Sequence, residues 1–157
     1  MTGGETIAAE LRRTRDDTVI GIVSRRAERR LDRAGIDAPR IEAQALLGHV
    51  LAVDRAGLLA RLRDPVAAEV AARFEALLER RLAHEPLQYL VGRASFLDFE
   101  VEVGRGVFIP RPETELLVER ALEEWSPDSR LAVDLCTGSG AIAIALARAR
   151  PALARRG

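Results

Sequence analysis

The chain has 157 residues, enough for one domain or two small ones, and its 48% hydrophobic and 31% charged residues indicate a globular protein. The 24 basic residues balance the 24 acidic ones, which gives no support to a general nucleic-acid or membrane binder. One cysteine, Cys136, excludes an internal disulfide, and because the N-terminus has no apolar signal segment and no stretch is apolar enough for a membrane span, we expect a cytoplasmic protein.

The first third of the chain shows the 3.6-residue period of amphipathic helices. Apolar residues at 19–34 recur with i, i+3, i+4 spacing, and Gly35 follows as a plausible helix stop. Asp37 can cap a second helix, in which the apolar residues of 43–51 form one stripe. These patterns predict two adjacent helices that each bury one face.

Two further helices are predicted before residue 85. Residues 54–62 can form a short third helix. Asp64 followed by Pro65 is a start signal, with Asp as N-cap and Pro in the first turn, for a helix that runs to Leu82. Three or four amphipathic helices with short links predict a small helical bundle over residues 1–85.

After Pro86 the period of the apolar residues changes from 3.6 to 2. Phe99, Val101 and Val103 alternate with glutamates, which predicts a half-exposed strand, and nearby glycines are turn candidates. Residues 86–112 therefore read as a β-hairpin linker.

The last third follows the order helix, strand, glycine turn, helix, at 113–124, 131–135, 136–140 and 141–150. This is how a doubly wound α/β domain begins. One parallel strand cannot make a sheet, and such a sheet needs both faces covered. We therefore expect residues 113–157 to be the first part of a larger domain and to be less stable than the bundle.

The glycine turn DLCTGSG, residues 134–140, has the features of a cofactor loop. Asp134 stands near the carboxyl end of the predicted strand, and Gly138 and Gly140 allow a sharp turn with close approach to a ligand. The following helix points its free N–H groups at the same place. A nucleotide-like cofactor fits, but GSGAIA also satisfies the dinucleotide pattern G-x-G-x-x-A, so NAD or FAD stays open, as does a turn without ligand.

Three stretches together resemble the HemK/PrmC family of S-adenosylmethionine-dependent methyltransferases: EPLQYLVGRASF (85–96), VFIPRPETELLVERAL (107–122) and DLCTGSGAIAIALA (134–147). That family methylates the glutamine of bacterial peptide chain release factors. The resemblance implies a two-part α+β chain: a release-factor-docking helical bundle, a β-hairpin linker, and the truncated start of a Rossmann-like class I methyltransferase domain. The P-R-P-x-T-E segment is its most specific part.

The resemblance also assigns candidate cofactor residues, on the glycine turn and on the stretch 107–122 that contains the P-R-P-x-T-E segment. These are Asp134, Cys136, Thr137, Gly138, Ser139, Gly140, Phe108, Pro110, Arg111 and Thr114. Plainer roles stand beside several of them: Arg111 as an anchor for its loop, Thr114 as a helix cap, and Cys136 as a small buried residue rather than a nucleophile. His49 and His84 are isolated, and no metal site is expected.

No catalytic residue is assigned, because the catalytic Asn-Pro-Pro-Tyr motif of the family is absent and the chain contains no Asn. An amide nitrogen is a poor nucleophile, so the motif's positioning of it is needed. We therefore expect no methyl transfer by this chain alone.

The Arg-rich run at 25–33 is a solvated helix face or part of a release-factor docking surface; no direct nucleic-acid contact is expected. A non-catalytic release-factor-binding module is the main alternative, and an NAD- or FAD-binding oxidoreductase fragment a weaker one.

Overall fold

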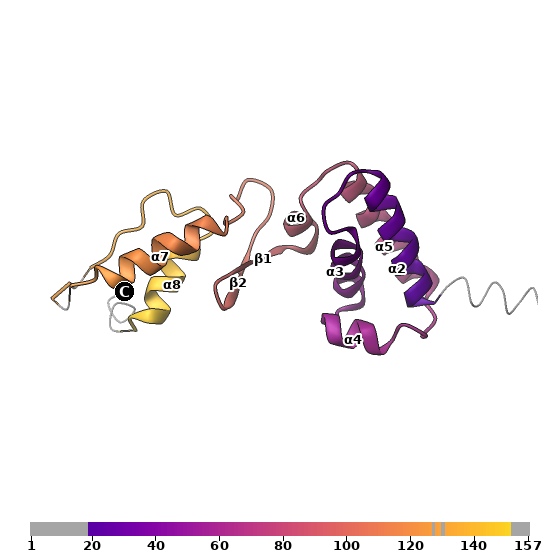
Figure 1. The fold of residues 1–157 in the computed structure, drawn as a ribbon, viewed down its shortest axis with the longest axis horizontal. Helices are drawn as coiled ribbons and strands as arrows, with labels where there is room; N and C mark the ends of the chain where they lie inside the picture. Colours follow the sequence, from indigo (N-terminus) through magenta and orange to yellow (C-terminus); the bar gives the residue numbers. More distant parts are fainter. Residues whose placement is uncertain (1–18, 127, 130, 152–157) are drawn as a thin grey trace, which may run out of the picture. The chain divides into compact units, whose positions relative to one another are not determined.

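A computed structural model describes residues 19–126, 128–129 and 131–151, in two compact units, Met1–Val91 and Gly92–Gly157 (Figure 1). The predicted absence of a signal segment at 1–18 lies outside the described residues. The first unit contains five helices among its described residues: α2 (Ile20–Arg33), α3 (Pro39–Leu51), α4 (Arg55–Ala60), α5 (Ala68–Leu82) and α6 (Leu87–Val91). The described part of the second contains β1 (Arg93–Phe96), β2 (Phe99–Glu102), α7 (Glu113–Glu123) and α8 (Ala141–Ala149).

The first unit is a small helical bundle with its own core, as predicted. α3 packs against α2, α4, α5 and α6, and α5 also packs on α2 (Figure 1). The apolar stripes seen in the sequence meet inside the bundle, where their burial removes apolar surface from water. The largest fully buried side chains of this core are Leu31, Leu46, Leu47, Leu58, Phe74 and Leu78.

Gly35 ends α2, as predicted, in a turn of the Schellman type. The Ile36 N–H donates to the Leu31 carbonyl at 3.0 Å and the Gly35 N–H donates to the Asp32 carbonyl at 3.0 Å. Gly35 has φ +71, a conformation that costs glycine little. Leu31 and Ile36 are both buried, so the turn also closes the apolar core at this end of the helix.

The segment around Asp64 and Pro65 does not start a helix, so that prediction is wrong. The Ile20 N–H donates to the Asp64 carbonyl at 3.0 Å and the Gly21 N–H donates to the Leu62 carbonyl at 2.9 Å, while Val19 forms an isolated bridge with Pro65. Backbone carbonyls of this loop thus satisfy the free N–H groups at the start of α2, which no side chain caps. This long-range pairing holds the loop against the start of α2, and α5 begins only at Ala68.

Asp37 is not the cap of α3, which corrects a second start signal. The N-cap is Ala38, in the left-handed region with φ 51, and Pro39 is the first helical residue. No side-chain hydrogen bond caps this helix. Its start is set instead by the proline in its first turn and by the Ala38 carbonyl, which accepts the first helical hydrogen bonds. The predicted short third helix is confirmed as α4, where the Asp54 carboxylate accepts from the Gly57 N–H at 2.7 Å.

The hairpin is confirmed in its strand pattern but begins later than the change of period suggested. β1 and β2 pair antiparallel with Phe96 opposite Phe99, and Val101 and Val103 are buried while the intervening glutamates are exposed. Before β1, residues 87–91 form the short helix α6 rather than a strand. The Pro86 carbonyl accepts from the Tyr89 and Leu90 N–H groups, and Leu90 is buried in the core of the bundle, so tertiary packing decides this turn.

The two predicted helices of the last third are confirmed as α7 and α8, which pack against each other (Figure 1). The predicted strand at 131–135 is not formed, and Leu131, Val133 and Leu135 are 77%, 68% and 81% exposed. A strand exists only through bonds to a neighbouring strand, and in the described residues the one sheet is β1 with β2. None of the helices in the described residues is long and apolar enough to cross a membrane.

Candidate functional site

The glycine turn leads into α8 through residues that alternate into the left-handed region. Cys136, Gly138 and Gly140 have φ values of +59, +58 and +77. The Thr137 hydroxyl donates to the Asp134 carboxylate at 2.8 Å, and the Gly140 N–H donates to the Thr137 carbonyl at 2.9 Å. These two bonds close the turn on itself and hold Asp134, which is half-buried, beside it.

The N-terminus of α8 opens directly from this turn. Gly140 is its N-cap, and no side chain accepts from the first N–H groups of the helix. Those N–H groups and the positive end of the helix dipole are therefore available to an electron-rich group. Ser139 and Gly140 are half-buried, whereas Cys136, Thr137 and Gly138 are exposed. The turn thus presents backbone, rather than bulky side chains, at its open side.

The structure brings Phe108, two residues before the P-R-P-x-T-E segment, near the glycine turn, within the second unit. A Cβ built on Gly138 would lie 3.9 Å from the Cβ of Phe108. The Phe108 side chain is 63% exposed, and the Arg111 guanidinium lies over its ring, 5.8 Å from the centroid. An aromatic face, a cation and the backbone of the turn therefore lie within one small region, which can bind a planar group together with a charged one.

Other residues of the P-R-P-x-T-E segment shape the backbone at the start of α7. Pro110 is half-buried and Pro112 is the N-cap of α7. Thr114 does not cap α7 through its side chain, which corrects that prediction; its N–H donates to the Arg111 carbonyl at 2.9 Å. The helix has already begun at Glu113, so the Thr114 hydroxyl stands past the cap position.

Cys136 is exposed, so its interpretation as a small buried residue is wrong. It occupies a left-handed position, where a side chain is strained and glycine is preferred. The position is fixed by the turn, and the turn projects the thiol to solvent instead of into a core. Among the described residues, no group of three or more His, Cys, Asp or Glu could hold a metal ion.

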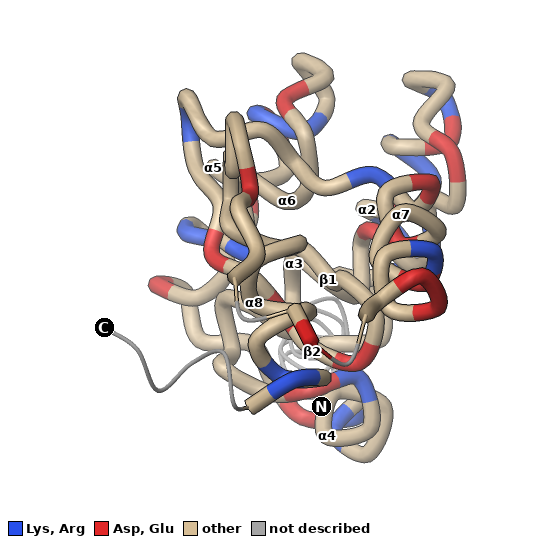
Figure 2. Tube along the Cα trace, turned by 90° about the vertical axis from the view of Figure 1, so that its left-hand side faces the viewer, with Lys and Arg blue, Asp and Glu red and all other residues tan. Residues whose placement is uncertain are grey.

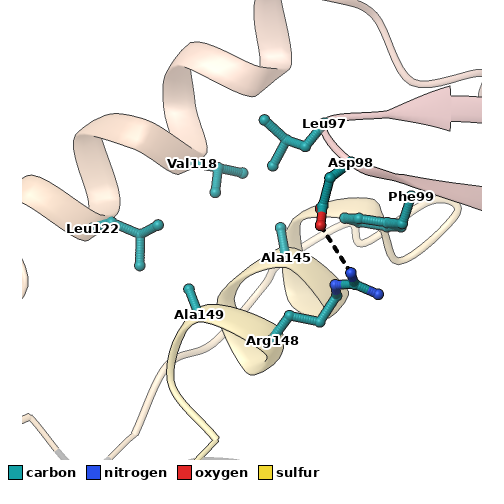
Figure 3. A pocket seen from close by; sticks show the side chains of 8 residues that line it. All are labelled: Leu97, Asp98, Phe99, Val118, Leu122, Ala145, Arg148 and Ala149. Atoms are coloured by element: carbon teal, nitrogen blue, oxygen red, sulfur yellow. Dashed lines mark hydrogen bonds and ion pairs between the residues drawn. The ribbon is translucent and has the colours of Figure 1, made fainter.

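A clamp at the tip of the hairpin was not predicted. Arg148 of α8 donates to the Asp98 carboxylate at 2.9 Å and lies 5.0 Å from the centroid of the Phe99 ring (Figure 3). The Leu97 N–H also donates to Glu115 of α7 at 2.8 Å. The clamp fastens the hairpin tip to the helix that follows the glycine turn. Asp98 and Arg148 are 50 residues apart, so no local pattern could reveal their contact.

The clamp borders a cavity of about 340 Å³ between the hairpin tip, α7 and α8 (Figure 3). Val118, Leu122, Ala145 and Ala149 form its apolar side, and none of the residues predicted for the cofactor lines it. The cavity is therefore separate from the region of Phe108 and the glycine turn.

Comparison with known proteins gives a match to one family model and to several similar proteins. Residues 23–92 match the family model of the PrmC N-terminal domain. A release factor glutamine methyltransferase of Mycolicibacterium smegmatis is 52% identical over 118 residues, which is 75% of this chain and 41% of that relative. Proteins of the same name from Moorella thermoacetica and Thermodesulfovibrio yellowstonii are 44% and 45% identical over 80% and 70% of this chain, and 44% and 40% of their own lengths.

The chain therefore spans less than half the length of these curated relatives. The family-model match covers the helical bundle from α2 to the start of the hairpin. The identities extend over most of the chain, well beyond that domain. Residues 23–92 thus match the N-terminal domain of the PrmC family, and the chain is similar to proteins named release factor glutamine methyltransferase over most of its length.

Proposed function

We propose that this protein acts in the S-adenosylmethionine-dependent methylation of a glutamine in peptide chain release factors. The observation that carries the proposal is the closeness of Phe108, two residues before the P-R-P-x-T-E segment, to Gly138 in the glycine turn. It brings the start of one distinctive motif near the other. The relatives that share this sequence are named release factor glutamine methyltransferases.

The residues of the second unit suit such a cofactor. The carboxylate of Asp134 can accept hydrogen bonds from hydroxyl or ammonium groups, and the free N–H groups of α8 can donate to a carboxylate. The exposed ring of Phe108 offers a stacking face, with Arg111 beside it. When bound, S-adenosylmethionine supplies an activated methyl group; these residues would hold and orient it.

The Rossmann-like character of residues 113–157 and the three-part division at 85 and 112 are part of the same proposal. α7, the glycine turn and α8 follow one another as expected, which supports it, although the strand expected between α7 and the turn is not formed. We also propose that these 157 residues transfer no methyl group by themselves, because they contain no Asn to position the substrate amide.

Calorimetric titration of S-adenosylmethionine tests the cofactor part, with this chain and with a longer product of the same gene. We expect the longer product to bind, and Asp134→Asn to weaken its binding about tenfold, since one charged acceptor is lost. Asp128→Asn is the matched control, because Asp128 is exposed, and should change nothing. Failure of the longer product to bind S-adenosylmethionine, or preferential binding of NAD or FAD, would refute the proposal.

A second candidate is a non-catalytic module that binds release factors. The independent core of the first unit, with fully buried Leu46, Leu47 and Phe74, supports it, because such a bundle does not need the cofactor region for its fold. The 157-residue chain should then capture purified release factor without S-adenosylmethionine. Capture that appears only with the cofactor would remove this candidate.

A further inference from the structure

The tip of the hairpin is fastened to both helices of the second unit. The Leu97 N–H donates to the Glu115 carboxylate of α7 at 2.8 Å. Arg148 of α8 donates to the Asp98 carboxylate at 2.9 Å. Acidic residues occur along α7 (Figure 2), and Glu115, the last residue of the P-R-P-x-T-E segment, lies in the first turn of that helix. The tip therefore contacts the helix before the glycine turn and the helix after it.

Leu97 holds a backbone conformation that leucine disfavours. Phe96 pairs with Phe99, so Leu97 and Asp98 alone form the loop, and Leu97 has φ +51. Two-residue hairpin loops call for such left-handed positions, where glycine or asparagine is usual. A leucine there costs free energy, which contacts outside the hairpin offset. The bond from the Leu97 N–H to Glu115 is such a contact, so the conformation of the tip depends on α7.

The packing of α8 by itself leaves the position of this helix loosely fixed. Its buried side chains are Ala141, Ala145 and Leu146, and alanine buries little apolar area. The cavity of about 340 Å³ lies beside the helix, with Ala145 and Ala149 in its wall (Figure 3). Empty space beside a helix removes van der Waals contacts that would resist its displacement. The contacts between α8 and the hairpin tip therefore contribute strongly to where α8 stands.

Each contact at the tip is weak alone, so several act together. The side chains of Arg148 and Asp98 are 54% and 77% exposed, and solvent screens an ion pair at such exposure. The Arg148 guanidinium also lies over the ring of Phe99, which adds a cation–π attraction. The charge-assisted bond from the Leu97 N–H to Glu115 holds the tip on the side of α7. Together these contacts fix the tip between α7 and α8.

α8 carries the position of Arg148 to the glycine turn. The helix runs from Ala141 to Ala149 without interruption, and Arg148 stands about 10 Å along its axis from Ala141. Gly140, the N-cap, belongs to the turn, and the free N–H groups of the helix follow it directly. A displacement of about 1 Å in the groups that hold a ligand can cost much of the function of a site. The contact at the C-terminal end of α8 thus acts on the turn at its other end.

We propose that the hairpin tip is a positioning element for the glycine turn, and that Asp98 and Glu115 are its positioning residues. Glu115 places the tip on α7, and Asp98 holds α8 there, so the turn keeps one position near Phe108. The glutamate of the P-R-P-x-T-E segment then acts at the tip rather than on the cofactor. That the turn holds S-adenosylmethionine rests on the function proposed above, whereas the positioning rests on these contacts.

Hydrogen exchange of the 157-residue chain tests the positioning without any cofactor. Asp98→Asn/Glu115→Gln removes both carboxylates from the tip. Glu119→Gln/Glu123→Gln, the matched control, makes the same change in net charge at two exposed residues of α7. We expect amides at 140–146 to exchange about tenfold faster in the first variant and to stay within about twofold in the control. Faster exchange there in both variants, or in neither, overturns the inference.

Exchange in the middle of α7 separates positioning of the turn from general stabilisation of the second unit. General stabilisation would speed exchange at 116–122 by the same factor as at 140–146, because the unit would open as a whole. We expect the α7 amides to change by less than about threefold. Asp98→Asn alone should speed exchange at 140–146 about threefold, and Asp98→Glu, which keeps the carboxylate, should leave it unchanged. Equal acceleration of both segments, or equal effects of the two substitutions, overturns the inference.

Calorimetric titration of S-adenosylmethionine into the longer product of the same gene gives the functional result. Asp98→Asn/Glu115→Gln should weaken binding about tenfold, and Glu119→Gln/Glu123→Gln should leave it within about twofold. If the longer product binds no S-adenosylmethionine, the proposed function is refuted, and the exchange measurements alone decide the positioning. If it binds, and the tip variant binds as tightly as the unchanged protein, the inference is overturned.

Discussion

The two units of this protein differ in how much of their apolar surface their own residues bury. In the first unit the helices share one closed core, in which Leu31, Leu46 and Leu58 have no exposed surface. In the second, Leu131, Val133 and Leu135 are largely exposed. An apolar segment becomes buried when its own unit supplies a surface to pack against, as for the bundle helices. It stays exposed when the unit supplies none, as for residues 131–135.

Backbone hydrogen exchange should show the largest difference between the units. We expect amides in the middle of α3 and α5 to exchange only through opening of the whole bundle, and those at 131–136 to exchange nearly freely. The difference should be about 1,000-fold or more, because core helices open with much of the global free energy. Mass spectrometry of the exchanging chain measures it, and equal protection in both segments would contradict the comparison.

The same substitution in both units should give very different losses of stability. Leu46→Ala removes a fully buried side chain from the bundle core and should cost about 2–5 kcal/mol of unfolding free energy. Leu135→Ala removes a side chain that is 81% exposed and should change it by less than about 0.5 kcal/mol.

Urea unfolding followed by circular dichroism at 222 nm measures the change for Leu46→Ala, since most helical residues lie in the first unit, and tryptophan fluorescence measures the change for Leu135→Ala. The only tryptophan, Trp125, lies in the second unit and reports on it separately. A loss for Leu135→Ala as large as that for Leu46→Ala would mean that the exposed segment is packed in solution.

Much of this organisation can be predicted from the sequence where the cause is local. The amphipathic periods predict the bundle helices, Gly35 predicts the end of α2, and the alternation around Val101 predicts β2, because each depends on neighbouring residues. Start signals are less reliable. Asp64 and Pro65 carry the local pattern of a helix start, but their backbone pairs with the beginning of α2.

The candidate site divides in the same way. The glycine turn and the P-R-P-x-T-E segment are visible as motifs, although only the structure shows that Phe108, just before that segment, lies near Gly138. The ion pair of Asp98 with Arg148 joins residues 50 positions apart and has no local signal. The prediction of a strand at 131–135 is wrong for the opposite reason. The local pattern is apolar enough, but a strand forms only when it can hydrogen-bond to a neighbouring strand.

Removing one charge from an ion pair should cost more unfolding free energy in the first unit, where the pair is sheltered, than in the second, where it is exposed. The side chains of Arg81 and Glu42 are only 13% and 15% exposed, whereas those of Arg120 and Glu123 are 75% and 62% exposed. Glu42→Gln should lower the unfolding free energy by about 1–3 kcal/mol, because Arg81 is left half-buried without its counter-charge. Glu123→Gln should lower it by less than about 0.5 kcal/mol. Urea midpoints of the two variants, taken at low and high salt, check the ordering, which equal effects would contradict.

The smallest expected effect concerns two of the residues held in the left-handed region, His84 in the first unit and Cys136 in the second. His84 follows α5 with φ +62, and its turn repeats that after α2: the Glu85 N–H donates to the Arg80 carbonyl at 3.1 Å and the His84 N–H to the Arg81 carbonyl at 2.8 Å. Since α2 has glycine at this position and α5 has histidine, His84→Gly should relieve strain and stabilise the bundle by about 0.5–1 kcal/mol.

Cys136→Gly makes the corresponding change in the glycine turn, where φ is +59. It should leave the midpoint at 222 nm unchanged, because the turn lies in the second unit, while the Trp125 transition moves to slightly higher urea. His84→Ala is the control for the first change, since alanine keeps a Cβ and should give no gain. A lower midpoint for His84→Gly than for His84→Ala would show that the imidazole itself stabilises the turn, and that strain relief is the lesser effect.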